Sequence, residues 1–524
     1  MNIFDKKDDI SQIILLFVTS LVLGYLFIYV PLNIYPAEDA AILFQYSENF
    51  AQTGSITYNL NGLPAEGATD FLWMIILGIM KFIGLDTYLA STILSMFALV
   101  GTAYLLYKMI NTDNKYYFYL FIALLISLPM TPAAIQGFSP LFFGFFITLS
   151  AYFLITNKPK YIFLSTLLLT LVRPDGIVFT TPLILSYFII NRGTTRHDLV
   201  LLLKYFILPG LIYFIWRWSY FGEFLPLPFY VKSNFTRHLW IFNKGSLDTN
   251  YYILKLFIPL IITSIILLSK NKFPKYTFSL IIALVVVPYL FYSSMLLSQN
   301  VSYRFQYSFI LGLIIIFAFS LRGNKNITYF IIALIIVVYQ VVNIYPNTKS
   351  KYSRLKNIPN ENITYIAKEL NTITNDAKMA ITEAGRLPYY SKWEAIDTWG
   401  LNTPQFAKVL IQPEDIKQFN PDLVVIHAGN NPDQYYKFFK KVYEEPIYTK
   451  RTWHNQCANI VKGIDMTRYT LYMVPFITSG KGRHDAYFIK KKFRYYDKVR
   501  QLLIKHKAKK INEYTDGRIN KLER

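Results

Sequence analysis

The chain has 524 residues, of which 53% are hydrophobic and 17% aromatic, and it carries a formal net charge of +22. This apolar fraction excludes an ordinary soluble protein, because several runs approach the ~20 apolar residues that a helix needs to cross a bilayer. The single cysteine excludes an intramolecular disulfide and a cysteine-based metal site. We find no Walker loop, no GxSxG motif, no His-x-x-His pair and no nucleic-acid-binding module.

We therefore expect a polytopic α-helical membrane protein with about eleven transmembrane helices. The first apolar segment is too long for a signal-peptide core and lacks a small-residue cleavage site, so we interpret it as a retained anchor. The expected spans are residues 12–30, 88–110, 116–132, 138–156, 160–172, 176–191, 199–216, 251–269, 275–297, 305–321 and 327–345.

Lysine and arginine concentrate in alternate loops, which indicates the topology. The positive-inside rule holds in every loop if the N-terminus is cytoplasmic and the apolar piece 71–84 does not cross the membrane. That piece is short for a span, so we expect a juxtamembrane or re-entrant helix on the outer side. The first outer loop, residues 31–87, then faces the periplasm or cell exterior.

The first part of this loop, residues 31–70, contains no lysine or arginine. Topology alone explains their absence, because translocated loops avoid cations. Glu38 and Asp39 stand directly before a predicted helix over 40–52. Asp39 as an ordinary N-cap, worth ~1 kcal/mol, is one interpretation; a carboxylate that points into a cleft is the other.

Glu66 and Thr69 lie at the entry to the short outer helix, in "AEGATDFLW". A simple turn and helix cap explains them about as well as a functional site. Further ionisable residues at the outer surface are functional candidates, because charges there are costly. These are Arg173 and Asp175 in "VRPDGIVF", Lys232 in the aromatic loop 216–234, and Arg304 at the start of a span.

Each of these three places also has a structural explanation. Arg173 and Asp175 could form a local ion pair. Arg304 could simply extend along the membrane surface towards water. Lys232 is the more informative one, because lysine suits phosphate binding as a point charge.

We divide the chain into a transmembrane domain, 1–345, and a soluble periplasmic domain, 346–524. The second domain has the pattern helix, strand, turn, strand, which predicts a small α/β fold. Its apolar runs "KMAIT" and "DLVVIH" are too short to span a membrane. It ends in a basic amphipathic tail, which could lie on anionic headgroups or an anionic polymer, or be merely solvated.

Four motifs in order resemble a family of bacterial GT-C glycosyltransferases that includes the mycobacterial terminal arabinofuranosyltransferases. They extend over residues 35–401. The quoted motifs are "EDAAILFQYSENFAQTGSITYN…EGATDFLW", "VRPDGIVF", "YFGEFLPLPFYVK" and, in the C-terminal part, "DTWGL".

The resemblance implies a GT-C-like enzyme whose active site lies on the outer face and whose donor is a polyprenyl-phosphate-linked sugar. Glu38 and Asp39 match the acidic pair in the loop where such enzymes place the catalytic base, with Asp39 preferred. The residues then expected to bind substrate are Glu66, Thr69, Arg173, Asp175, Tyr220, Lys232 and Arg304. No metal ligand is assigned, although assistance by a divalent cation stays open.

Two departures from the family pattern concern the substrate. Gln45 stands where the family usually carries arginine, and "QGFSPLF" (136–142) lacks the usual glutamate. They leave the donor sugar open, with a pentofuranose as one candidate, and the acceptor undefined.

The sequence thus predicts an inverting glycosyltransferase at the outer face of the bacterial inner membrane, acting on a glycan or glycoconjugate acceptor. One alternative is a transporter or flippase of a lipid-linked glycan. Transporters usually place polar sites near the midplane of inverted repeats, and neither feature is visible here. The other alternative is a non-catalytic subunit of cell-envelope assembly.

Overall fold

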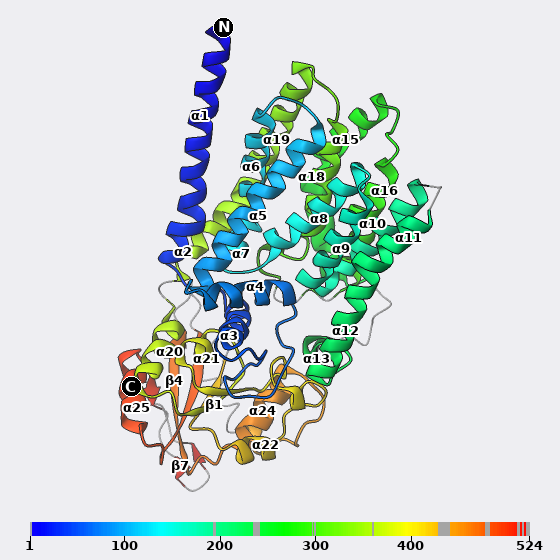
Figure 1. The fold of residues 1–524 in the computed structure, drawn as a ribbon. Coiled ribbons are helices and arrows are strands. Elements are labelled where there is room, and N and C mark those ends of the chain that lie inside the picture. Colours follow the sequence, from blue (N-terminus) through cyan, green and yellow to red (C-terminus); the bar gives the residue numbers. More distant parts are fainter. Residues whose placement is uncertain are drawn as a thin grey trace.

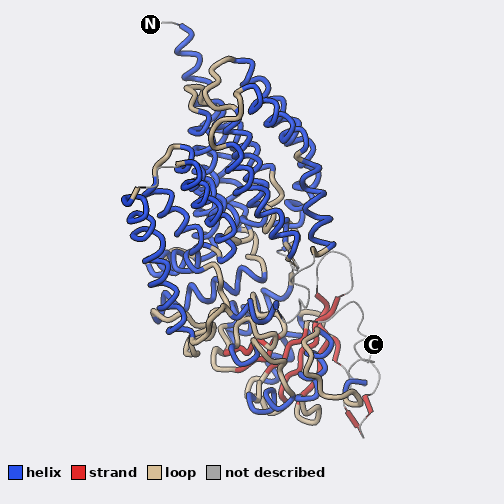
Figure 2. The backbone as a smooth tube through the Cα atoms, turned by 90° about the vertical axis from the view of Figure 1, so that its right-hand side faces the viewer, coloured by secondary structure: helices blue, strands red, loops and turns tan. Residues whose placement is uncertain are grey.

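The computed structural model describes residues 3–191, 195–233, 242–295, 297, 300–358, 361–427, 441–476, 483–510, 514–515 and 518–519. These residues form a bundle of helices with a sheet-containing domain at one end (Figure 1). Two helices of the first outer loop, α3 (Glu38–Thr53) and α4 (Phe71–Phe82), lie between the two parts. In the rotated view, the strands gather at the end of the molecule opposite the N-terminus (Figure 2).

The bundle is built from helices joined by short turns, and π-helical turns join α1 to α2, α11 to α12 and α16 to α17. Its helices are α1 (Ile3–Gly24), α2 (Val30–Leu32), α5 (Thr87–Ile110), α6 (Tyr116–Ser127), α7 (Thr131–Ile135), α8 (Pro140–Ile155), α9 (Pro159–Val172), α10 (Ile177–Ile190), α11 (Arg196–Leu202), α12 (Leu208–Phe221), α13 (Leu227–Ser233), α14 (Lys244–Leu256), α15 (Ile258–Lys270), α16 (Thr277–Ile281), α17 (Val287–Ser294), α18 (Tyr307–Ser320) and α19 (Ile327–Leu355).

Every predicted span coincides with a helix, but the helices differ in length. Within the described residues, six are long and apolar enough to cross a membrane, or seven if α14 and α15, bent by 61°, form one span. The other four predicted spans are the shorter apolar helices α6, α8, α9 and α10. The expected number of about eleven is therefore reached only when these shorter helices are counted.

The burial pattern agrees with a lipid environment. All 14 residues of α18 are buried, which makes it the central helix of the bundle. The helix pair α11 and α12 instead exposes large aliphatic side chains such as Leu203, Ile212 and Ile215. Aliphatic residues around the outside and a close-packed centre are what a bundle solvated by hydrocarbon requires.

The helix α4 is the apolar piece that we expected not to cross the membrane. It has 12 residues, too few for a span, and lies crosswise between the bundle and the C-terminal domain (Figure 1). Its end exposes Ile79, Phe82 and Ile83. A short crosswise helix with exposed apolar residues is typical of an interfacial position.

The C-terminal domain is a sheet covered by helices on both faces. The strand order is β2-β1-β3-β5-β4-β6; β1 pairs in parallel with β2 and β3, and the other pairs are antiparallel. Its elements are α20 (Asn362–Ile373), β1 (Lys378–Ile381), α21 (Arg386–Ser391), β2 (Glu394–Asp397), α22 (Pro413–Phe419), β3 (Leu423–Ile426), α24 (Trp453–Gly463), β4 (Tyr469–Phe476), β5 (Arg483–Lys490), α25 (Tyr496–Lys505) and β6 (Lys509–Lys510).

Successive side chains of a strand point to opposite faces of the sheet, so each face packs against its own set of helices. Met379 and Ile381 pack with α20 and α25, whereas Ala380, between them, packs with α22 and α24. The short apolar runs predicted as strands are β1 and β3, which are parallel neighbours. The predicted α/β fold of the C-terminal part is thereby confirmed.

The first outer loop shares a hydrophobic core with this sheet domain. Tyr46, Ile56, Tyr58 and Met74 belong to the same buried cluster as the α20 face of the sheet. The Asn59 side chain also continues the sheet, because it exchanges two 2.9 Å hydrogen bonds with the backbone of Ala395 at the edge strand β2. The loop therefore connects the bundle rigidly to the sheet domain.

The helix α19 continues past residue 346 and ends at Leu355.

A close approach of two backbones fixes this connection. A Cβ atom at Gly385 would lie 2.1 Å from the carbonyl oxygen of Glu38, so only glycine fits between the turn after β1 and the start of α3. We predict that Gly385→Ala lowers the stability of the protein by about 1–3 kcal/mol, as overpacking does. Thermal unfolding of the detergent-purified protein measures this. In Gly24→Ala, the added Cβ meets no atom within 4 Å; an equal loss in that control would contradict the prediction.

Candidate active site

The first turn of α3 carries two adjacent carboxylates that face different parts of the molecule. Asp39 turns to the bundle, where its Oδ2 lies 2.9 Å from a guanidinium nitrogen of Arg304. Arg304 in turn stacks on the ring of Phe138, 4.1 Å from its centroid. The Asp39 side chain stays 32% exposed, so it is held in place and remains accessible to a substrate.

Glu38 turns to the C-terminal domain instead. One carboxylate oxygen accepts hydrogen bonds from the backbone N–H groups of Gly385 and Arg386, at 2.9 and 3.0 Å. The other oxygen accepts from Nε of Arg386 at 3.1 Å. Arg386 is also paired with Glu361. Both oxygens of Glu38 therefore hold the interface between α3 and α21.

The turn between α9 and α10 supplies a second ion pair close to Arg304. Arg173 donates two hydrogen bonds to Asp175, of 2.9 and 2.8 Å, and Tyr292 donates a third to the same carboxylate at 2.7 Å. The Phe305 ring lies 5.2 Å from the guanidinium carbons of both Arg173 and Arg304. One aromatic ring thus holds two arginines side by side.

Asp70, the residue directly before α4, belongs to the same group. Its carboxylate accepts a hydrogen bond from the hydroxyl of Ser139. Burial raises the pKa of Asp70, and the positive charges of Arg173 and Arg304 oppose this rise. Asp70 was not among the predicted site residues, although it belongs to the stretch "AEGATDFLW"; its place where a loop meets an apolar helix is the signal that could have found it.

Lys232, on α13, completes the group. Its side chain remains accessible to water, but the surrounding protein desolvates the ammonium and lowers its pKa. The carboxylates of Asp39 and Asp70 oppose this effect, and the two arginines strengthen it. We call the whole set the charged cluster; it consists of Asp39, Asp70, Arg173, Asp175, Lys232 and Arg304.

The structure therefore brings together five of the nine predicted site residues, which come from four separate stretches of the sequence, and adds Asp70. Of the other four, Glu38 contacts the start of α21, as described above, and three lie elsewhere. Among the described contacts, Tyr220 accepts a 2.9 Å hydrogen bond from the backbone of Ile56, and Thr69 directly precedes Asp70. Glu66 faces Arg217, away from the charged cluster.

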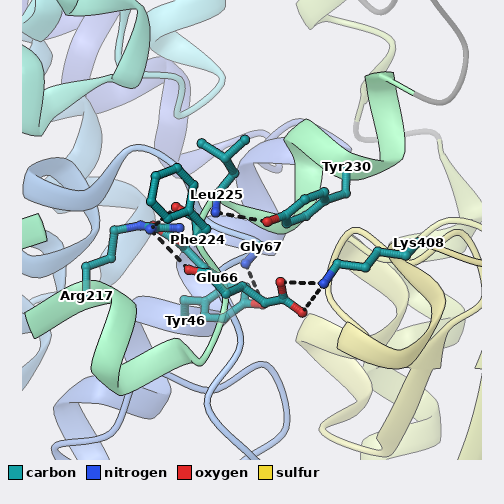
Figure 3. A network of polar contacts seen from close by, with 9 residues as sticks. Tyr46, Glu66, Gly67, Arg217, Phe224, Leu225, Tyr230 and Lys408 are labelled. Atoms are coloured by element: carbon teal, nitrogen blue, oxygen red, sulfur yellow. Dashed lines mark hydrogen bonds and ion pairs between the residues drawn. The ribbon is translucent and has the colours of Figure 1, made fainter. Parts of the chain in front are cut away.

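Figure 3 shows the surroundings of Glu66. Arg217, from α12, forms a bidentate ion pair with Glu66, and its third nitrogen donates to the carbonyl groups of Glu223 and Phe224. The Glu66 and Arg217 side chains are only 7% and 5% exposed. Burial raises the pKa of Glu66, against the effect of Arg217. This pair ties the first outer loop to α12, and Lys408 of the C-terminal domain adds an exposed ion pair with Glu223.

Within the described residues, no group of three or more His, Cys, Asp and Glu side chains has a geometry suited to a metal ion. The chemistry that the charged cluster offers is a pair of arginines and a lysine facing carboxylates. Such a set can bind a phosphate and accept a proton.

Comparison with known proteins identifies the fold. Crystal structures of ArnT from Cupriavidus metallidurans in the apo state and bound to undecaprenyl phosphate superpose with TM-scores of 0.57 and 0.56, at 13% and 12% identity. The alignments cover 92% and 90% of this chain, and 98% and 97% of theirs. The protein is thus a multi-pass membrane protein of the GT-C-like fold class, as expected from the motifs.

The sequence comparisons are less informative. Residues 355–472 match a family model described as a domain of unknown function (DUF8728). No curated protein matches the chain. At the identities of the two ArnT structures, the likeness establishes the fold, and the activity has to be argued from the site.

The buried Glu66–Arg217 pair gives a stability prediction. Arg217→Met leaves the Glu66 carboxylate buried without its cation, which should cost about 3–5 kcal/mol. The double variant Arg217→Met/Glu66→Met removes both charges and should recover most of the loss, because no uncompensated charge remains. Thermal unfolding of the purified variants measures both. Lys408→Met, which breaks the exposed pair with Glu223, serves as the control and should have little effect. A double variant as unstable as the single one would contradict the prediction.

Proposed function

We propose that this protein is an inverting glycosyltransferase that moves a sugar from a polyprenyl-phosphate donor to a hydroxyl of an acceptor glycan or glycoconjugate. The observation that carries the proposal is the position of Asp39. This accessible carboxylate opens α3 at the junction of bundle and sheet domain, beside the cations Arg173, Lys232 and Arg304. A base next to a phosphate-binding set is what this reaction requires.

The step balances with these residues alone. The acceptor oxygen attacks the anomeric carbon from the face opposite the phosphate, and the bond between that carbon and the phosphate oxygen breaks. The hydroxyl proton passes to Asp39, which must come within ~3 Å of it. The polyprenyl phosphate leaves as an anion. Glu38 is a weaker candidate for the base, because hydrogen bonds from Gly385 and Arg386 occupy both of its oxygens.

The cations suit the leaving phosphate because they are held before it binds. Asp175 and Tyr292 orient Arg173 from one side, and the Phe305 ring supports it from another. Arg304 is oriented in the same way by Asp39 and Phe138. Preorganised donors stabilise developing charge without reorganising during the reaction. Lys232 adds a point charge close to both arginines.

The lipid part of the donor needs an apolar surface next to these cations. The helix α4 begins directly after Asp70 and exposes Ile79, Phe82 and Ile83 at its far end. An isoprenoid chain along α4 would lie in the bilayer while its phosphate reaches the charged cluster. One of the ArnT structures of the same fold is bound to undecaprenyl phosphate, which supports a donor of this class.

The distribution of lysine and arginine among the loops indicates which face of the membrane the site is on. The positive-inside pattern puts the N-terminus in the cytoplasm. The charged cluster and the C-terminal domain then lie on the periplasmic or extracellular face of the bacterial inner membrane.

The sugar is the least constrained part of the proposal. A pentofuranose follows only from the motif resemblance. One of the two departures from that pattern has a structural function here. Gln45 donates a 2.7 Å hydrogen bond to the carbonyl of Tyr58, which helps to position the first outer loop.

A transporter or a non-catalytic subunit is the competing function. The charged cluster lies at one end of the bundle, between its helices and the C-terminal domain, whereas transporter sites usually lie near the membrane midplane. A non-catalytic subunit has no use for the base or for the lysine. Both alternatives predict that no donor is consumed.

The test is turnover of a panel of synthetic polyprenyl-phosphate sugars by the purified protein, with water as a slow acceptor. Asp39→Asn should lower the release of free sugar by about 10²- to 10⁴-fold, because it removes the general base. Glu38→Gln should affect stability more than turnover. Asp113→Asn, at a position that is 99% exposed, is the matched control. If both α3 variants turn over donor like wild type, the assignment of the base is wrong.

The cations give a second prediction. Lys232→Met should lower donor turnover by about 10²- to 10³-fold, as the loss of one preorganised donor does. It should also weaken inhibition by undecaprenyl phosphate, which resembles the leaving group. Lys408→Met, a lysine outside the charged cluster, should change neither quantity. Normal inhibition of the Lys232 variant by the lipid phosphate would exclude phosphate contact by this lysine.

A further inference from the structure

The C-terminal domain has a second group of ionisable side chains, at the carboxyl end of its parallel strands. The chain runs from β1 to β2 on one side and then to β3 on the other, so the order reverses at β1. In open α/β sheets, ligands bind outside the carboxyl ends of the strands at such a switch point. Glu383 follows β1 here, and His427 follows β3.

Side-chain contacts connect the loops after β1 and β3 to each other and to β5. The His427 ring places Nδ1 2.8 Å from a carboxylate oxygen of Asp485 and Nε2 3.5 Å from a carboxylate oxygen of Glu383. The backbone N–H of His427 donates to the Thr382 hydroxyl at 2.8 Å. The side chain of Asp485 is 5% exposed, that of His427 20% and that of Glu383 33%. Glu383 is thus the member that a ligand can reach.

The charges of the group support each other. Burial lowers the pKa of His427, but Asp485 and Glu383 outweigh it and raise the pKa to about 9. The imidazolium therefore persists at neutral pH and holds the Glu383 carboxylate. Burial, together with the charges of Glu38, Asp485 and Asp39, raises the pKa of Glu383 to about 7, against the effect of His427.

Backbone contacts of the next residues show where the turn that carries Glu383 lies. Gly385, two residues further on, is packed against the backbone and carboxylate of Glu38, and Tyr58 donates to the Ala384 carbonyl at 2.6 Å. The turn after β1 therefore lies against the first turn of α3, which carries Asp39. Glu383 belongs to the sheet-domain side of this junction, whereas Arg304 contacts Asp39 from the bundle.

We propose that Glu383 binds the acceptor, accepting a hydrogen bond from a hydroxyl adjacent to the one that Asp39 deprotonates. His427 and Asp485 act as positioning residues. This inference rests on the proposed function. It assigns Glu383 to the part of the site that binds the acceptor and names the chemical class of that acceptor. Four carboxylates at this end, those of Glu38, Glu361, Glu383 and Asp485, pair with only two cations, Arg386 and His427. The excess of negative charge disfavours a phosphate and suits a neutral, hydroxyl-rich glycan. The cations on the bundle side suit the donor.

The test separates transfer from hydrolysis. Purified protein receives the donor that wild type consumes, together with a panel of neutral octyl glycosides as acceptor probes, and both transfer product and free sugar are measured. Glu383→Gln should raise the KM for the glycoside about 5- to 10-fold, because its neutral amide oxygen accepts a weaker hydrogen bond than the carboxylate does. Its hydrolysis of donor by water should stay within about twofold of wild type, because water needs no hydroxyl-binding residue.

His427→Gln tests the positioning residue and should raise the same KM with little change in hydrolysis. Glu394→Gln is the matched control; Glu394 begins β2, at the amino end of the parallel strands and thus opposite to the end that carries Glu383 and His427, and its side chain is 49% exposed. A Glu383 variant in which hydrolysis and transfer fall equally, or in which neither changes, overturns the proposal. So does a wild type that hydrolyses donor but transfers to no neutral glycoside. If wild type consumes no donor, the proposed function fails and this inference with it.

Discussion

The contact between the first turn of α3 and the turn after β1 is the constraint on which the site depends. Glu38 accepts three hydrogen bonds from Gly385 and Arg386 there, and the two backbones meet where no side chain fits. The shared core of the first outer loop and the sheet domain supports this contact. Without it, the base candidate on α3 and the residues at the carboxyl ends of the strands would belong to two independent units.

The two sides of Asp39 offer different charges to a ligand. The bundle supplies Arg173 and Arg304, and α13 supplies Lys232. On the sheet side the most exposed of the described charges is Glu383, and the cations there, His427 and Arg386, are paired with carboxylates. In a site of low dielectric this difference acts over several ångströms, because the attraction between charges is weakly screened. An anionic donor would then be attracted to the cations on the bundle side of Asp39, and a neutral acceptor would bind on the other side through hydrogen bonds, which is the arrangement that an in-line displacement needs.

Part of this arrangement could be predicted from the sequence. Arg173, Lys232 and Arg304 could be assigned to one face of the membrane because the positive-inside rule orients every loop, and residues at one face have a good chance of meeting. The group of Glu383, His427 and Asp485 could not, because it requires the pairing of three strands whose order has no local signal. The partner of Glu66 was missed for the same reason: Arg217 lies 151 residues away. Helix lengths also depend on packing, so four predicted spans proved to be short helices.

Helix geometry explains why Glu38 and Asp39 contact different parts of the molecule. Successive residues on an α-helix point about 100° apart, because a turn takes 3.6 residues. Two adjacent carboxylates at a helix start therefore cannot serve the same cleft. One of them can hold the neighbouring domain while the other enters the space between the domains. The acidic pair of the first outer loop is thus better understood as one interface residue, Glu38, and one residue that stays accessible to a substrate, Asp39.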